Sequence, residues 1–208
     1  MKYIPIVVFI FQFQLLFSQK EVERQSFLDI GINITSVLSS FSGNGNFLDA
    51  TEVPLIIRIG RKRVKLRLGV GASGNSSDFI DPISGAFRES INQTYVGRVG
   101  LEYHFHLTQK WQFYIGADLN GLYNLREIDV FSPQSGFNRD REYGVGGGPL
   151  MGIRFNISDR IYLSTETTMY GQYINTEVTS SFSPNATSTN RWNFEISPPL
   201  FLYFNYSF

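Results

Sequence analysis

The feature that most constrains this chain is a two-residue alternation of apolar and polar side chains, which recurs in eight separate runs. In the clearest run, VKLRLGVGAS, Val64 and Leu66 fall in one phase while Lys65 and Arg67 fall in the other. Successive side chains of a β-strand point to opposite faces of a sheet, so this period predicts half-buried strands. The runs cover residues 28–35, 53–60, 64–73, 95–105, 111–123, 143–155, 161–170 and 200–208.

The connections between these runs alternate between short and long. The short ones are predicted near 60–63, 107–110 and 158–160, and the long polar ones at 39–52, 74–91, 126–141 and 174–190. This order places every long connection at one end of the sheet and both termini at the other. The chain is therefore predicted to be all-β, an eight-stranded antiparallel up-and-down barrel. Within the last long connection, TSSFSPNATSTN (179–190) is expected to be an exposed flexible loop.

The polar phase of the strands carries a balanced set of charges and most of the glycines. A balanced set favours an enclosed lumen, because buried charges need partners, and glycine inside a small barrel makes room for larger neighbours. A lipocalin-like barrel, with its apolar face inward around a ligand, is the alternative. The predicted lumen charges are Asp29, Arg58, Lys65, Arg67, Arg98, Glu102, Asp118, Arg154, Glu166 and Glu195.

Aromatic residues on the apolar phase gather near the two ends of the predicted barrel. Trp111 and Tyr206 lie near the short-turn end, and Tyr143 and Trp192 near the long-connection end. Two aromatic belts around an apolar band are typical of a barrel that faces lipid at both membrane interfaces.

Length and composition fit one such domain. The chain has 208 residues, 18 basic and 18 acidic side chains and no cysteine. The charge balance predicts no nucleic-acid partner, and the lack of cysteine excludes disulfides and thiolate metal sites. At the start, Lys2 and an apolar stretch ending near Ser18 predict a secretory signal peptide at 1–18, and an uncleaved anchor helix is the alternative. A short periplasmic segment (19–25) and the barrel (26–208) then follow.

The final strand, FLYFNYSF, alternates apolar residues and stops on an aromatic. It resembles the C-terminal signal of bacterial outer-membrane barrels, and the whole predicted mature chain is similar to the small eight-stranded OmpA-transmembrane and OmpX type. The resemblance implies insertion into the outer membrane of a Gram-negative bacterium, with both termini in the periplasm and the loops at the cell surface. It also implies that the assembly machinery reads the last strand at Phe204, Tyr206 and Phe208. Lipid of the outer membrane is then the immediate partner.

Proline is the main departure from regular strands. Pro54, Pro149 and the pair Pro198–Pro199 interrupt predicted runs, where proline removes a hydrogen bond of the ladder. These positions are predicted to be bulges where strands leave the membrane.

The residues do not predict an enzyme, a cofactor or a metal. Some barrels of the resembled type modify lipid A, and such activity would need a histidine near the long-connection end. His104 and His106 instead lie beside the short turn at Leu107 and are expected to be hydrogen-bonded lumen residues. The glycine run GVGGGP (144–149) lacks the context of a phosphate loop.

The predicted function is a non-enzymatic barrel with a plugged lumen, because eight strands enclose a space that side chains fill. Its loops would bind something or its barrel would support the envelope. An accessory subunit of a larger outer-membrane complex and, less favoured, a lipid A-modifying enzyme are the alternatives.

Two predicted loops share a pattern of proline, Ser-Gly, an aromatic and a cation: PISGAFR (82–88) and PQSGFNR (133–139). Both are predicted to be ordered hairpins that extend the strands. Aromatic and arginine side chains are frequent anchors of binding surfaces, so a surface for another outer-membrane protein or a glycan is predicted at Phe87, Arg88, Phe137 and Arg139. Packing of the two phenylalanines between the hairpins is the alternative.

Overall fold

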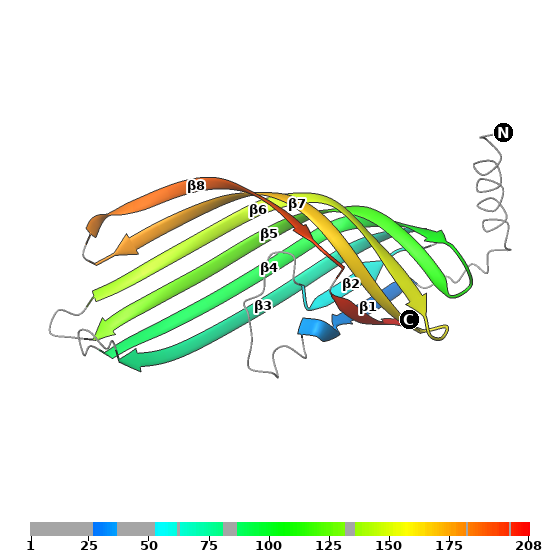
Figure 1. Ribbon diagram of the computed structural model, residues 1–208, viewed down its shortest axis with the longest axis horizontal. Coiled ribbons are helices and arrows are strands. Elements are labelled where there is room, and N and C mark those ends of the chain that lie inside the picture. Colours follow the sequence, from blue (N-terminus) through cyan, green and yellow to red (C-terminus); the bar gives the residue numbers. More distant parts are fainter. Residues whose placement is uncertain are drawn as a thin grey trace, which may run out of the picture.

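The computed structural model describes residues 27–36, 53–61, 63–80, 87–131, 136–181, 183–199 and 201–208. The predicted signal peptide (1–18) and periplasmic segment (19–25) lie outside the described residues. The described residues form one antiparallel sheet with almost no helix (Figure 1). Its strands are β1 (Leu28–Asn33), β2 (Leu55–Ile59), β3 (Val64–Ile80), β4 (Phe87–His106), β5 (Trp111–Phe131), β6 (Gly136–Asn156), β7 (Ile161–Ser180), β8 (Ser183–Ser197) and β9 (Leu202–Ser207).

The sheet closes on itself as a ring of eight strands. Strands β1 to β7 pair in sequence order, and β9 closes the ring by pairing with β7 on one side and β1 on the other. Thr165 lies opposite Leu202, and Asp29 lies opposite Ser207. Strands β8 and β9 pair one after the other with the same edge of β7. Pro198 and Pro199 lie between these two strands in the chain. The predicted all-β, eight-stranded up-and-down fold is confirmed.

Three of the predicted long connections are mostly strand. Strands β3 and β4 remain paired up to Ile80 opposite Phe87, and β5 and β6 up to Val130 opposite Gly136. The flexible loop predicted over 179–190 was wrong, because β7 and β8 form a hairpin there with Ser180 opposite Ser183. Both faces of this extension are largely polar, so the two-residue alternation that revealed the lower strands is missing from its sequence.

Strands β1 and β2 are much shorter than their neighbours. They have 6 and 5 residues, whereas β3 to β7 have 17 to 21. Beyond them, the described part of the chain continues as an open sheet of strands β3 to β8, with β3 and β8 at its edges (Figure 1). The structure is therefore a closed ring at the end with the short turns and a six-stranded extension at the other end.

The prolines behave in two ways. Pro54 directly precedes β2, where its carbonyl oxygen accepts a hydrogen bond from the Asn33 N–H at 2.8 Å. The bulge predicted at Pro149 was wrong, because β6 continues through it and the pairs Gly147–Gly171 and Leu150–Thr168 keep one register. Only the two intervening pairs are missing. Proline lacks an N–H and so removes hydrogen bonds locally, while the pairing of β6 with β5 and β7 on either side of it keeps the register. A register irregularity occurs instead between Val178 and Ser180.

The tight turns are stabilised by short-range hydrogen bonds. The Thr108 hydroxyl accepts from the Trp111 N–H at 3.0 Å, and the Ser158 hydroxyl accepts from the Ile161 N–H at 3.1 Å. Gly60 begins the remaining short turn with φ of 158°, a conformation that side chains rarely allow.

Candidate functional site

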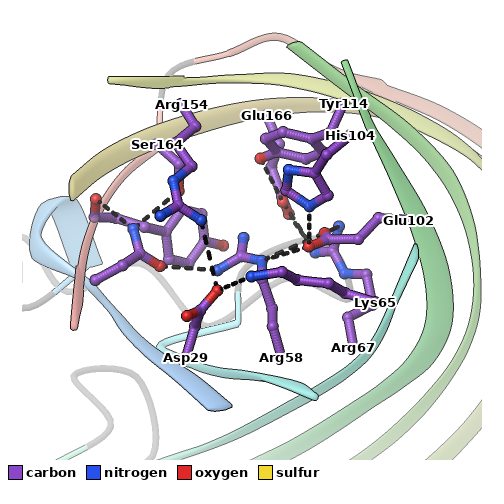
Figure 2. Close-up of polar contacts among 12 residues, drawn as sticks. Asp29, Arg58, Lys65, Arg67, Glu102, His104, Tyr114, Arg154, Ser164 and Glu166 are labelled. Atoms are coloured by element: carbon purple, nitrogen blue, oxygen red, sulfur yellow. Dashed lines mark hydrogen bonds and ion pairs between the residues drawn. The ribbon is translucent and has the colours of Figure 1, made fainter. Parts of the chain in front are cut away.

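The interior of the ring contains a buried network of charges (Figure 2). Nine of the ten predicted lumen charges are at most 6% exposed. The tenth, Glu195, is half-buried on β8, where it lies opposite Tyr170. The nine are Asp29, Arg58, Lys65, Arg67, Arg98, Glu102, Asp118, Arg154 and Glu166.

Glu166 on β7 holds two arginines from the opposite wall. Its carboxylate lies 2.9 Å from Arg67 Nη2 and 3.1 Å from Arg98 Nη1. Asp118 supports the same pair, with its Oδ1 3.4 Å from Arg67 Nε, and the Tyr170 hydroxyl donates to its Oδ2 at 2.7 Å. Two acids and two arginines from strands β3, β4, β5 and β7 thus fix opposite walls of the ring to each other.

Glu102 joins this group to the next one. Its carboxylate lies 3.0 Å from Arg58 Nε and 3.6 Å from Arg67 Nη1. His104 Nε2 is 2.9 Å from Glu102 Oε1, the same oxygen that lies nearest Arg58 Nε. The His104 ring also stacks on Tyr114, with 5.3 Å between centroids. His104 is thereby held by an acid and an aromatic ring in the interior, as Figure 2 shows.

Asp29 organises the charges nearest the short-turn end. It accepts from Lys65, from the Tyr162 hydroxyl at 3.0 Å and from the Ser207 hydroxyl at 2.7 Å. Arg154 Nη1 lies 3.5 Å from its Oδ2, and the Arg154 guanidinium stacks 3.4 Å above the Tyr162 ring. This group ties the first strand to the last one, because Ser207 lies in β9.

Asn205 is a member of the network for which the sequence contains no distinctive signal. Arg58 Nη1 donates to its Oδ1 at 2.8 Å, and its own Nδ2 donates to the Ser164 hydroxyl at 3.0 Å. The room for Asn205 comes from Gly31, because a Cβ at Gly31 would lie only 2.1 Å from Asn205 Oδ1. Only the register between β1 and β9 brings these two residues together.

The charges are capped by an apolar cluster on the side of the extension. Val53, Ile56, Val96 and Tyr203 are buried there, and Leu122 and Phe201 pack against them. Among the described residues, the interior is therefore filled with paired charges at one level and with apolar side chains at the next.

The outer face of the ring has the opposite character. Cross-strand rows such as Leu66–Leu101–Ala117 place exposed apolar side chains side by side on neighbouring strands. Ring contacts mark the short-turn end of this surface, with Trp111 4.7 Å from Phe155 and Tyr206 4.8 Å from Phe208 between centroids.

A row of tyrosines marks the other end of the apolar surface. Tyr95, Tyr123 and Tyr143 lie opposite one another on three strands, with ring centroids 6.1 and 5.2 Å apart. Farther along the same face the side chains become charged, as in the cross-strand pairs Glu89–Asp129 and Glu127–Arg139. The outer face thus passes from apolar through tyrosine to charged within a few residues.

The predicted insertion signal lies on this outer face. Phe204 and Phe208 are 40% and 66% exposed, and Tyr206 is half-buried. The Phe208 N–H donates to the Leu28 carbonyl oxygen at 2.9 Å, so the end of the chain is anchored to the first strand.

The structure does not bring the four predicted surface residues together. Phe137 and Arg139 are adjacent on one face of β6, with the guanidinium 5.8 Å from the ring centroid and also paired with Glu127. The hydrogen bond that Arg139 donates to the Glu127 carboxylate raises the pKa of Arg139. Phe87 lies on β4, with β5 between it and Phe137, and Arg88 follows Phe87 in the strand and so falls in the opposite phase.

No group of three or more acidic, histidine or cysteine side chains suited to a metal ion occurs among the described residues. Within the same ranges no helix is long and apolar enough to cross a membrane. No protein-family model, curated protein or solved structure matches the chain.

Proposed function

We propose that the chain is a non-enzymatic, integral outer-membrane β-barrel of the OmpA-transmembrane and OmpX type, with a plugged lumen and with surface hairpins that bind a partner or support the envelope. The supporting observation is the inverted polarity of the ring. Charges are buried and paired inside, whereas large apolar side chains such as Leu119 (68%) and Val145 (64%) are exposed outside. In water this arrangement would be unfavourable, and in lipid it is the stable one.

The spacing of the aromatic residues supports a bilayer as the surrounding medium. Trp111 and Tyr123 begin and end the apolar part of β5 and are 12 residues apart. With a rise of ~3.4 Å per residue and a tilt of ~40°, they would be separated by ~30 Å along the barrel axis. This separation equals the thickness of the hydrocarbon core, about 30 Å.

The proposal is tested by localisation and gel mobility. The protein should fractionate with the outer membrane, and its folded form should migrate differently from its boiled form on a gel. Recovery in the soluble periplasm, with identical mobility before and after boiling, would rule the proposal out.

The absence of enzymatic activity is part of the proposal. The buried His104 is hydrogen-bonded to Glu102 and lies near the short-turn end, away from the hairpins that would meet an outer-leaflet substrate. The mass of lipid A should be unchanged in a deletion strain. A change in that mass by one acyl chain would contradict the proposed absence of enzymatic activity.

The binding role would belong to the hairpin surface around Phe137 and Arg139. Phe137→Ala should lower the capture of an envelope partner from intact cells with little change in the unfolding midpoint. Lower stability with undiminished capture would assign this side chain to packing instead.

The open edges of the extension favour a second candidate, an accessory subunit of a larger outer-membrane complex. Strand β3 beyond Val70 and the length of β8 each pair with a strand on one side among the described residues. Unpaired edges are sites where another protein adds a strand. Cross-linking in intact membranes, followed by purification in mild detergent, should then recover the same barrel partner in constant ratio.

A further inference from the structure

A groove with a volume of about 440 Å³ crosses the outer face of β3, β4, β5 and β6. Gly116 lies at its floor, together with the main chain at Glu102, whose side chain points into the interior. Its walls are exposed side chains, all apolar or aromatic: Val64, Leu101, Tyr103, Ile115, Pro149 and Met151.

The groove results from a change in side-chain size along two strands. On β5 the outward residue after Ile115 is Ala117, and on β6 the outward residue opposite Ala117 is Pro149. Both are short, whereas Leu119 farther along β5 is 68% exposed. Small residues between larger ones leave a depression in the middle of the apolar surface.

The short-turn end of the groove carries a cation and a phenol. Arg63 precedes the groove residue Val64, and its Nη1 donates to the Tyr103 hydroxyl at 3.3 Å. Both side chains are exposed. Guanidinium and hydroxyl groups are common ligands of a phosphate oxygen, and arginine can bind it through two parallel hydrogen bonds.

We propose that this groove binds one phospholipid, with an acyl chain along Leu101, Ile115 and Met151 and the phosphate at Arg63 and Tyr103. The inference rests on the proposed membrane location. An apolar channel that ends at a cation matches a molecule with a hydrocarbon chain and an anionic head, and neither free phosphate nor a bare hydrocarbon uses both parts. The volume lies within the range of small-molecule sites, about 300–1,000 Å³.

The test counts lipids that stay bound to the purified barrel. The folded protein is reconstituted into vesicles of phosphatidylethanolamine and phosphatidylglycerol, extracted into mild detergent and examined by native mass spectrometry. Wild type should retain one phospholipid. Ile115→Trp fills the groove and should lower the retained fraction about tenfold. Leu119→Trp, on the same face of β5 outside the groove, is the matched control and should retain the lipid.

A second pair of variants tests the head-group end. Arg63→Gln should lower retention about tenfold, since it removes a charge-assisted hydrogen bond. Arg61→Gln is its control, because Arg61 lies in the same turn but is positioned over the Phe27 ring, 5.8 Å from its centroid. Equal retention by all four variants, or equal loss in the two controls, would overturn the proposal.

The outcome separates the groove from the barrel itself. Gel mobility and membrane insertion are measured for every sample first. If wild type fails to insert, the proposed function fails. If all variants insert and retention does not depend on Ile115 and Arg63, only the lipid site is refuted.

Discussion

At the scale of single residues, the buried arginines are expected to be the most sensitive positions. Arg67 lies within 3.6 Å of three carboxylates, those of Glu102, Asp118 and Glu166. Arg67→Leu would leave these acids short of a positive partner, and breaking a buried pair costs about 3–5 kcal/mol. The urea midpoint of the barrel folded in lipid vesicles should fall accordingly, whereas Arg61→Leu in an exposed turn should leave it unchanged.

A double-mutant cycle checks the physical reason for this loss. Arg67→Leu combined with Glu166→Leu removes both charges of the closest ion pair that Arg67 makes. The double variant should therefore lose less stability than the sum of the two single variants. Additive losses would mean that the charges contribute through packing rather than through each other.

Glycine in the interior gives a second prediction at this scale. A Cβ at Gly152 would lie 2.3 Å from Cζ of the buried Tyr114 ring and 2.5 Å from the Thr165 carbonyl oxygen. Gly152→Ala should therefore destabilise the barrel by about 1–3 kcal/mol, as overpacking usually does. Gly97→Ala is the matched control, because a Cβ there meets no atom within 4 Å. Similar unfolding midpoints for the two variants would contradict this account.

At the scale of the elements, we expect the last strand to have separate roles in assembly and in stability. Phe208 is 66% exposed, and its ring contacts only Tyr206 among the described aromatic rings. The polar side chains of β9 meanwhile reach the interior, where Ser207 bonds Asp29. Deleting Phe208 should therefore slow membrane assembly more than it lowers the urea midpoint of the folded barrel. Pulse–chase conversion to the folded gel form measures the first quantity. A normal assembly rate with a large loss of stability would refute the proposed signal.

The two predicted loop phenylalanines lie on different hairpins of the extension. Phe87 and Phe137 lie on β4 and β6, and β5 separates them. Their alanine substitutions should affect stability additively, within about 0.5 kcal/mol. A larger coupling energy in a double-mutant cycle would show that the two rings pack together after all.

At the scale of the whole molecule, the interior should not conduct ions. The charged groups span the ring from Asp29 near one end to Glu166, and the apolar cluster of Val53, Ile56 and Val96 covers them. Eight strands enclose only enough space for such side chains. Purified protein in planar bilayers should show negligible conductance, and a stable, large channel would contradict the plugged interior.

The sequence by itself determined the strands of the ring and which face of each is polar. Period 2 is a local property: once Val64 and Leu66 share a face, Lys65 and Arg67 must share the other. The alternation of short and long connections then predicted an up-and-down strand order. The same local pattern predicted the nine charged side chains that are buried in the interior of the ring.

The tertiary structure decided what depends on register and closure. Arg67 and Glu166 are 99 residues apart, and they meet because the stagger of the closed ring brings β3 and β7 to one level. The same stagger puts Asn205 over Gly31 and leaves β1 and β2 short, while β3 to β8 continue as paired strands through stretches that looked like loops. No local pattern encodes these relations, since they follow from hydrogen-bond pairing between strands distant in the chain, and that pairing is fixed only when the sheet closes.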